Sequence, residues 1–596
     1  MKRIIKRAFG SPCGKIILIA LVIAVCGRLA YSYQLNENLL GGSDFTGHIT
    51  LVGYIANYFD VGWFEFWHGG YPLIKYVSPA AYLMASFPAL FAGDIIAYKM
   101  IMDFFFLLAP LAFLVLIKDF RLADWQKAAA VLFFSFFPAG AHYFFENSFT
   151  TTVNIVFALL FWKSIINYSE KKTRKNLLFS GLFFSFMILA HQLTAVFAGA
   201  VILVWAAFKY RKIVWKPFIA AALISGFWLF PFLLEYRGDS LIESSFSFNV
   251  VSSIINDIGA LQLAGFAFFF AALLLFSIRF RKDRDFLSFA AVIALILLIV
   301  AFSSYFRTVA FVSIPAAFLF AKIFPERKWA FVIAIAALAM IAFSFYTLRG
   351  GVNTAGHEAW EMPASQDRMI FYPNGHDYCE QTGCPKSTYS SYLAPKYGQE
   401  IMDGMRFQYL MVGGMREKRF AFFQKITSPL NSAPEELSGL FRAGFVNSIV
   451  VNKNFPEYAE YFGGTSLFIK TNETEHFLVF EPAQKSGFIE LDSKPVESGV
   501  ERARNALNVS FDCSPGTLLV KESYDNYWSA SISGEQLRIA PDKYGFMEME
   551  IDGAGACVLE MSYNPIGGYA IFYIISFAAL LAFFANAVLK GRKTPS

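Results

Sequence analysis

The chain has 596 residues, of which 56% are hydrophobic and 18% aromatic, including 69 phenylalanines. This composition excludes an ordinary soluble domain and is typical of a protein with extensive lipid-facing and interhelical surfaces. The formal net charge is +6, but the basic residues concentrate in short clusters between apolar runs, so the charge indicates orientation in a membrane and not nucleic-acid binding.

Apolar runs predict about twelve membrane-spanning helices. No small-residue cleavage site follows the basic residues 1–7 and the first run, so we expect a retained signal-anchor helix. Residues 80–92 form a shorter, Pro-interrupted run that we expect to be re-entrant or to lie at the membrane surface. The predicted spans are 15–33, 96–117, 128–145, 150–168, 176–190, 193–208, 216–234, 258–279, 287–302, 307–323, 328–347 and 567–589.

Loop charges give an independent prediction of the topology. Basic residues are frequent in residues 1–7 and then in every second loop, ending with the tail after 589, whereas the alternate loops carry far fewer, chiefly Arg237 and Arg307. Cytoplasmic loops are enriched in Lys and Arg, so both termini are predicted to be cytoplasmic and the chain to be a multi-pass plasma-membrane protein.

The first outer loop, residues 34–79, carries an acid and a histidine one helical turn apart. Ser43 is a plausible N-cap, and apolar residues then recur at helical spacing, which predicts a short amphipathic helix. Asp44 and His48, at i and i+4, project from the same face near its start. A purely structural interpretation remains open, in which Asp44 stabilises the helix start and His48 is a satisfied interfacial histidine.

Residues 350–565 are polar and fall on the predicted outer side. We divide the chain into a transmembrane module (1–349), an α/β subdomain (350–485), a β-sandwich subdomain (486–565), and a last span with a cytoplasmic tail (566–596). The predicted sandwich strands include 517–521, 528–533, 546–551 and 557–562. An oxidising compartment would favour the disulfides Cys379–Cys384 and Cys513–Cys557, with a zinc site as the weaker alternative for the first pair.

Further ionisable residues fall at the predicted outer ends of helices, where they are candidates for function because charges are costly in a bilayer. Each also has a structural interpretation as a solvated loop charge, a core histidine or a snorkelling arginine. Together with Asp44 and His48 they would line a cavity that opens outward. These residues are His142, Glu146, His191, Glu235, Arg237 and Arg307.

The motifs together resemble the GT-C superfamily of membrane glycosyltransferases, and more closely the prokaryotic membrane-protein family named for a 6-pyruvoyl-tetrahydropterin synthase-related domain. The name implies no pterin chemistry here. The match consists of Gly42-Ser43-Asp44 with His48, Gly62-Trp63, Trp67, Gly69-Gly70-Tyr71-Pro72, Pro79, Ala190-His191-Gln192-Leu193-Thr194, Glu522-Ser523-Tyr524 and Trp528-Ser529-Ala530.

This resemblance implies a polytopic α-helical fold with an outer α/β and β-sandwich domain, and transfer of a sugar from a polyprenyl-phosphate donor to an outer glycan, lipid or protein acceptor. Asp44 would be the general base, with His48 and Glu146 beside it as catalytic candidates. Arg307, His191 and Arg237 would contact the donor, and Trp63, Trp67 and Tyr71 would stack on sugars. The sequence supports no cofactor; if a divalent cation binds, Asp44, His48, His142 and Glu146 are the ligands to test.

Two alternatives remain at this stage. The chain could be a transporter or an assembly factor for a surface polysaccharide or glycolipid, or a receptor with a membrane base. A transporter should show internal repeats or broken helices with charges at mid-membrane, whereas the predicted charges gather at one face. No phosphate-binding loop, HExxH or GxSxG motif is present, which disfavours ATP-driven pumps and the commoner hydrolases.

Overall fold

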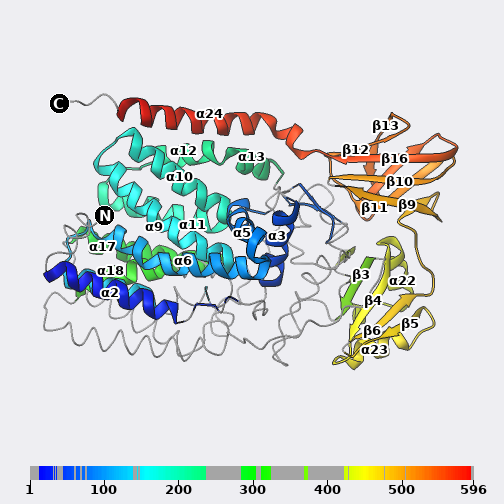
Figure 1. The fold of residues 1–596 in the computed structure, drawn as a ribbon, viewed down its shortest axis with the longest axis horizontal. Helices are drawn as coiled ribbons and strands as arrows, with labels where there is room; N and C mark the ends of the chain where they lie inside the picture. The colour runs from blue at the N-terminus through cyan, green and yellow to red at the C-terminus, as the bar shows by residue number, and fades with distance from the viewer. Residues whose placement is uncertain are drawn as a thin grey trace.

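A computed structural model of the chain places, among the residues that it describes, an α-helical bundle beside three larger β-sheets (Figure 1). The residues that it describes are 12–30, 32–33, 35, 45–58, 62–66, 70–73, 77–137, 144, 148–235, 283–303, 311–323, 368–372, 400, 422–423, 425–426, 429–475, 477–503 and 505–591.

The described helices of the bundle follow the apolar runs of the sequence. They are α2 (Pro12–Leu29), α3 (Phe45–Tyr58), α5 (Pro79–Ala92), α6 (Asp94–Ile117), α7 (Asp124–Phe136), α9 (Phe149–Glu170), α10 (Arg174–Ala190), α11 (Gln192–Tyr210), α12 (Lys216–Ile224), α13 (Gly226–Glu235), α17 (Arg284–Ser303), α18 (Ser313–Ile323) and α24 (Pro565–Gly591).

One large apolar core holds the described helices from α2 to α18 together, and aromatic pairs are frequent in it. Phe113 of α6 stacks on Phe134 of α7 with ring centroids 4.4 Å apart, and Trp162 of α9 meets Trp205 of α11 edge to face at 5.3 Å. Because lipid tails are as apolar as these side chains, van der Waals packing and not hydrophobic burial must stabilise such contacts in a membrane.

By length and composition, α6, α9 and α11 are able to cross a membrane. The run predicted as one span, 216–234, consists of two helices, because the chain bends by 87° between α12 and α13. The break exposes the backbone N–H of Phe227, which donates to Ser576 Oγ of α24 at 2.7 Å. A polar residue on the last helix therefore satisfies the break. The predicted spans 258–279 and 328–347 lie outside the described residues, and the count of twelve stays a prediction.

The first sheet beyond the bundle has four strands in the order β3-β4-β6-β5. Its strands are β3 (Arg368–Tyr372), β4 (Val446–Asn452), β5 (Phe468–Glu473) and β6 (Phe477–Pro482), with α22 (Pro434–Ala443) and α23 (Pro456–Gly463) between them in sequence. β3 and β4 are parallel and the other pairs antiparallel. All seven residues of β4 are buried, as expected for a central strand.

The other two sheets share one apolar core and form a β-sandwich. Their strand orders are β13-β12-β16-β10-β9 and β14-β15-β11-β7-β8. Buried and exposed residues alternate along β10 and β16, because one face packs on the core and the other faces solvent. The strands are β7 (Ile489–Leu491), β8 (Lys494–Val496), β9 (Ser498–Ala503), β10 (Ala506–Cys513), β11 (Gly516–Ser523), β12 (Trp528–Ile532), β13 (Glu535–Leu537), β14 (Ile539–Pro541), β15 (Phe546–Ile551) and β16 (Gly555–Tyr563). The four strands predicted from the sequence are confirmed within a few residues at each end.

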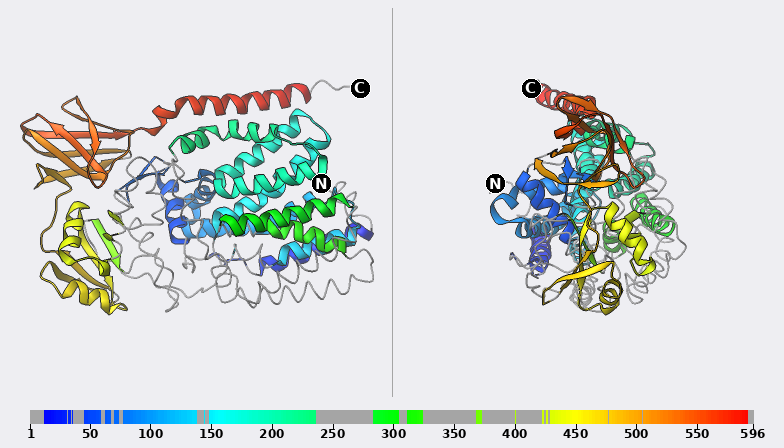
Figure 2. Two further views of the ribbon diagram at one scale, coloured as in Figure 1. Left: turned by 180° about the vertical axis from the view of Figure 1, so that it is seen from behind. Right: turned by 90° about the vertical axis from the view of Figure 1, so that its right-hand side faces the viewer.

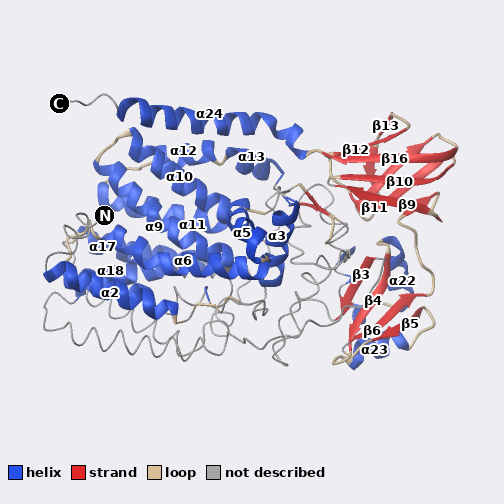
Figure 3. Cartoon of the chain, in the orientation of Figure 1, coloured by secondary structure: helices blue, strands red, loops and turns tan. Residues whose placement is uncertain are grey.

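The sheets lie at one end of the bundle, which we call the sheet end (Figures 1 and 2). Helix α24 leaves β16 there and runs along the bundle beside α12 and α13 to the opposite end (Figure 3). A short hairpin of β1 (Trp63–Phe64) and β2 (Tyr71–Pro72), from the predicted first outer loop, reaches from the bundle to the sandwich. The first loop and the C-terminal sheets therefore meet at the sheet end.

Candidate functional site at the sheet end of the bundle

His48 lies in the first turn of α3 in contact with three other helices. Its side chain is buried, and Nδ1 lies 2.7 Å from the hydroxyl of Tyr82 in α5. The rings of Tyr98 in α6 and Phe149 in α9 also pack against it, with centroids 6.3 and 5.7 Å away. The geometry agrees with the structural interpretation of His48 as a satisfied core histidine. Asp44 lies outside the described residues, directly before α3.

The turn between α10 and α11 presents a second histidine. Nδ1 of His191 accepts a hydrogen bond from the backbone N–H of Thr194 at 3.3 Å and thereby caps α11. Since a backbone N–H can only donate, Nδ1 is unprotonated, and the proton of the neutral ring is on Nε2. The half-buried His191 ring is therefore held with Nε2 as its donor atom.

Neighbouring helices hold this turn in place. Asn154 of α9 donates from Nδ2 to the carbonyls of Met187 and His191, at 3.2 and 3.1 Å. The hydroxyl of Ser78, the residue before α5, bonds to Gln192. Helices α3, α5, α9 and α11 thus all begin in this region. The positive ends of their helix dipoles favour a nearby anion.

The sequence analysis missed a buried ionic group inside the predicted spans. Lys99 and Asp103, one turn apart on α6, are 1% and 9% exposed. Asp103 Oδ1 accepts from the backbone N–H of Tyr33 at 3.0 Å. The signal was available, since charges within an apolar run are functional candidates, but both residues were counted only as part of a span.

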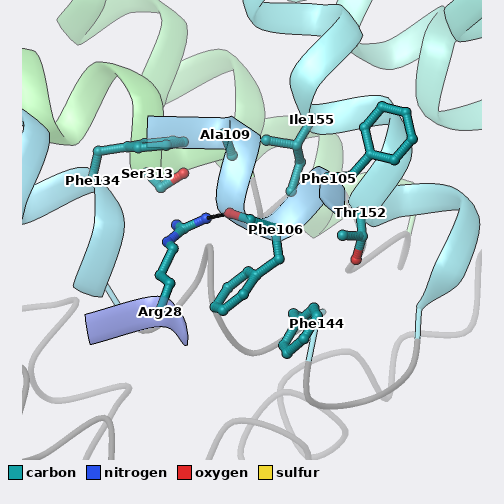
Figure 4. Close-up of a pocket in the computed structure, with 9 residues that line it drawn as sticks. All are labelled: Arg28, Phe105, Phe106, Ala109, Phe134, Phe144, Thr152, Ile155 and Ser313. Atoms are coloured by element: carbon teal, nitrogen blue, oxygen red, sulfur yellow. Dashed lines mark hydrogen bonds between the residues drawn. The ribbon is translucent and has the colours of Figure 1, made fainter. Parts of the chain in front are cut away.

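Arg28, near the end of α2, was missed for the same reason. Its guanidinium donates to the carbonyls of Ser135 and Phe106, at 3.1 and 2.6 Å, and lies 4.3 Å from the centre of the Phe106 ring. Figure 4 shows the small pocket beside it, which Phe144 and Thr152 also line. Its volume of about 10 Å³ is roughly the space that one water needs, so the pocket is too small for a sugar.

At the far side of the site, the first loop is bonded to the sandwich through Trp63. The indole N–H donates to Glu522 Oε1 at 2.9 Å, and the backbone N–H donates to Asn505 Oδ1 at 2.8 Å. The indole also packs on Trp528 and Tyr563, with centroids 5.1 and 4.8 Å away. Trp63 is 3% exposed, so its ring surface is used inside the protein and not presented to a sugar.

Glu522 is the centre of an ionic network that we call the Glu522 junction, formed by Glu522, Arg502, Arg368 and Glu400. Glu522 is fully buried and lies 3.0 Å from Arg502 and 3.7 Å from Arg368. Glu400 lies 2.8 Å from Arg368 and 2.7 Å from Arg502. Arg368 also donates to the carbonyl of Lys521, so the network joins the four-stranded sheet to the sandwich.

Two carboxyl groups of this region have opposite pKa shifts. Burial acts to raise the pKa of Glu400, but the guanidinium groups of Arg502 and Arg368 outweigh it and hold the pKa below its usual value. Burial raises the pKa of Glu65, which follows β1, because its opposing interactions, including that with Arg502, are weaker. Glu65 thus takes up a proton more readily than an exposed glutamate.

The remaining predicted site residues are described in part or lie outside the described ranges. Tyr71 is in β2, opposite Phe64, and only its backbone is described. Cys513 and Cys557 form a disulfide between β10 and β16. Within the described ranges, no three His, Cys, Asp or Glu side chains gather as metal ligands do. The predicted residues that lie outside the described part of the chain are Asp44, Trp67, His142, Glu146, Arg237, Arg307, Cys379 and Cys384.

Solved structures share this fold. The arabinofuranosyltransferase AftD from Mycobacteria superposes with a TM-score of 0.54 at 10% identity, covering 92% of this chain and 57% of that chain. A mutant form of the same protein superposes with a TM-score of 0.55, also at 10% identity, covering 92% of this chain and 60% of that chain. ArnT from Cupriavidus metallidurans bound to undecaprenyl phosphate superposes with a TM-score of 0.48 at 13% identity, covering 79% of this chain and 98% of that chain. A TM-score of this size does not by itself establish a shared fold. The chain thus spans little more than half of AftD. A search of curated proteins found no match.

Helical bundle, hairpin and outer sheets together define a membrane protein with a GT-C-like fold. The resemblance to this family is confirmed over residues 74–349, which match the model described as "6-pyruvoyl-tetrahydropterin synthase related domain; membrane protein"; of the quoted motifs, Pro79 and Ala190–Thr194 lie in this segment. The match ends before the C-terminal sheets, so the Glu522 junction lies between residues outside the matched segment.

Proposed function

We propose that this protein is an integral-membrane glycosyltransferase that moves a sugar from a polyprenyl-phosphate donor to a glycan, lipid or protein acceptor outside the cytoplasm. The observation that carries the proposal is the fold shared with an arabinofuranosyltransferase over 92% of the chain, with helix starts and His191 gathered at the sheet end. A likeness at 10% identity supports the class of reaction and leaves the sugar, the lipid and the acceptor open.

In this proposal the donor phosphate lies near the starts of α9 and α11. The Nε2–H of His191 donates to a phosphate oxygen, and Arg307 and Arg237 supply positive charge as the phosphate leaves. Asp44 removes the proton of the acceptor hydroxyl while that oxygen attacks the anomeric carbon. The sugar–phosphate bond breaks as the new glycosidic bond forms, and the lipid phosphate keeps the electron pair.

His48 has a positioning role here. Its bond to Tyr82 and its packing on Phe149 keep the first turn of α3 against α5 and α9. Trp67 and Tyr71 remain candidates for contact with a sugar, whereas Trp63 belongs to the contact with the sandwich. A divalent cation stays a testable addition, with Asp44, His48, His142 and Glu146 as ligands.

One observation favours a second function. The 87° break between α12 and α13 is a feature of transporters, whose broken helices expose backbone groups to a substrate. Here Ser576 takes up the N–H of Phe227, and Ser225 donates to the carbonyl of Ala221. These two groups are thus satisfied inside the protein, so they are not offered to a substrate as those of a transporter's broken helix would be.

The test is glycan and glycolipid profiling of cells with wild type, a deletion, Asp44→Asn and the control Asp124→Asn. Asp124 also begins a helix, α7, but forms a half-buried pair with Lys127 away from the sheet end. We expect Asp44→Asn to reproduce the glycan lost in the deletion, with normal protein in the membrane, and Asp124→Asn to match wild type. Normal glycans in Asp44→Asn cells would instead favour the transporter or assembly factor.

A further inference from the structure

The hairpin β1–β2 has glycine at two places where its backbone meets the sandwich. Gly70 has a φ of +90°, in the region that favours glycine, and a Cβ there would lie 2.3 Å from Glu522 Oε1. A Cβ on Gly62 would lie 2.5 Å from Asn505 Oδ1. Neither distance permits a side chain, so both glycines are needed for the hairpin to approach the sandwich this closely.

The same hairpin is also bonded to α3. The hydroxyl of Tyr54 donates to the carbonyl of Trp63 at 2.7 Å and lies 3.2 Å from Glu65 Oε2. Its ring packs edge to face on Phe64, with centroids 4.7 Å apart. Tyr54 and His48 belong to one continuous helix, so a displacement of the hairpin acts on the helix that carries His48.

These contacts form a connected path from the outer domain to the first turn of α3. Glu522 bonds Trp63, Trp63 bonds Tyr54, and Tyr54 and His48 share α3. Every member of the path is less than 8% exposed, so water does not compete for these bonds. Glu522 is itself fixed by Arg502 and Arg368 and cannot turn to follow a displaced hairpin.

We infer that Glu522 is a positioning residue: through Trp63 and Tyr54 it sets the place of α3 relative to the outer sheets. The outer domain then acts on the reaction by fixing the first loop. The effect on the reaction rests on the proposed function, whereas the connection from Glu522 through Trp63 and Tyr54 to α3 does not depend on it.

The test is hydrogen–deuterium exchange on the full-length protein in detergent. Trp63→Phe keeps an aromatic ring and removes the N–H that bonds Glu522. We expect amide exchange in residues 45–58 to rise by about tenfold or more, the factor for a lost bond to a charged group, with exchange in residues 149–170 unchanged. The control Glu560→Gln alters an exposed acid on β16 and should leave both segments unchanged. Unchanged exchange in 45–58 of Trp63→Phe would overturn the inference.

Two further variants keep the test decisive. Tyr54→Phe breaks the path without touching Glu522 and replaces Trp63→Phe if that variant does not fold; it should also raise exchange in 45–58. Glu522→Gln keeps an oxygen for Trp63 and should loosen α3 less than Trp63→Phe does. If transfer activity is found, Trp63→Phe should lower kcat with little change in KM for the lipid donor, because α3 is displaced and the donor site is not. Absence of activity in wild type would defeat the proposed function, while the exchange result would still decide the inference.

Discussion

Replacement of Glu522 by alanine should destabilise the outer sheets strongly. Glu522 is fully buried and accepts from Trp63 at 2.9 Å while it faces Arg502 at 3.0 Å and Arg368 at 3.7 Å. Removing one partner of a buried ion pair costs about 3–5 kcal/mol, because an uncompensated charge remains. We expect about 3 kcal/mol, the lower end of that range, because both arginines keep Glu400 as a shared partner.

The assay is thermal unfolding of the full-length protein in detergent, followed by tryptophan fluorescence. For a domain of this size, each kcal/mol shifts the melting temperature by about 2–4 °C, so Glu522→Ala should lower that of the outer sheets by roughly 6–12 °C. Glu560→Ala, on the exposed face of β16, should shift it by less than about 2 °C. A Glu522→Ala protein that melts with wild type would refute the burial and pairing described here.

Four further predictions concern other residues of the site and of the outer sheets. Burial raises the pKa of Glu65, so its charged form lowers the stability of the folded protein; Glu65→Gln should therefore have a higher melting temperature than wild type at pH 8. Below about pH 4.5, where Glu65 of the unfolded chain is also protonated, the two melting temperatures should be equal. Glu400→Gln should have a lower melting temperature than wild type at pH 8, and this difference should shrink as the pH falls through the lowered pKa of Glu400. An equal melting temperature of wild type and Glu65→Gln at every pH would contradict the buried position of Glu65. His191→Asn keeps a side chain that can cap α11 but removes the ring N–H donor, so it should retain wild-type stability and lose sugar-transfer activity. His191→Ala should lose the cap as well, which costs about 1 kcal/mol of stability. Sugar transfer by His191→Asn at the wild-type rate would show that His191 does not contact the donor. Reduction of the Cys513–Cys557 disulfide, or replacement of both cysteines by serine, should lower the melting temperature of the sandwich. The disulfide closes a loop over a sequence separation of 44 residues and contributes about 2–4 kcal/mol to stability. An unchanged melting temperature would show that the strand pairing alone holds β10 to β16.

The sequence predicted the parts of the fold that depend on local pattern. The predicted apolar runs agree with α6, α9, α10 and α11 within a few residues, and the predicted strand 557–562 lies within β16. The break after Ile224 had a local signal in Ser225-Gly226, but the mean hydropathy of the run 216–234 favoured one continuous span. What permits the break is Ser576, which lies 349 residues from its partner Phe227 in sequence.

The candidate site was predicted less completely, for a physical reason. His48 and His191 were found because they lie in short motifs, but whether a side chain faces a substrate or another part of the protein depends on its long-range partners. Trp63 resembled a sugar-stacking residue, yet its indole bonds Glu522, which lies 459 positions away. Lys99, Asp103 and Arg28 were hidden in runs that were read only for their length.

The central claim is tested most directly by transfer from a radiolabelled polyprenyl-phosphate sugar with the purified full-length protein, in the presence of membrane glycolipid extract. The account predicts label in an acceptor with wild type, and a loss of about 10²–10⁴-fold with Asp44→Asn, the contribution that a general base makes. Adding EDTA to a parallel reaction tests the proposed cation. Transfer by Asp44→Asn at the wild-type rate would contradict the assigned base, and no transfer from any of a panel of polyprenyl-phosphate sugars would contradict the glycosyltransferase itself.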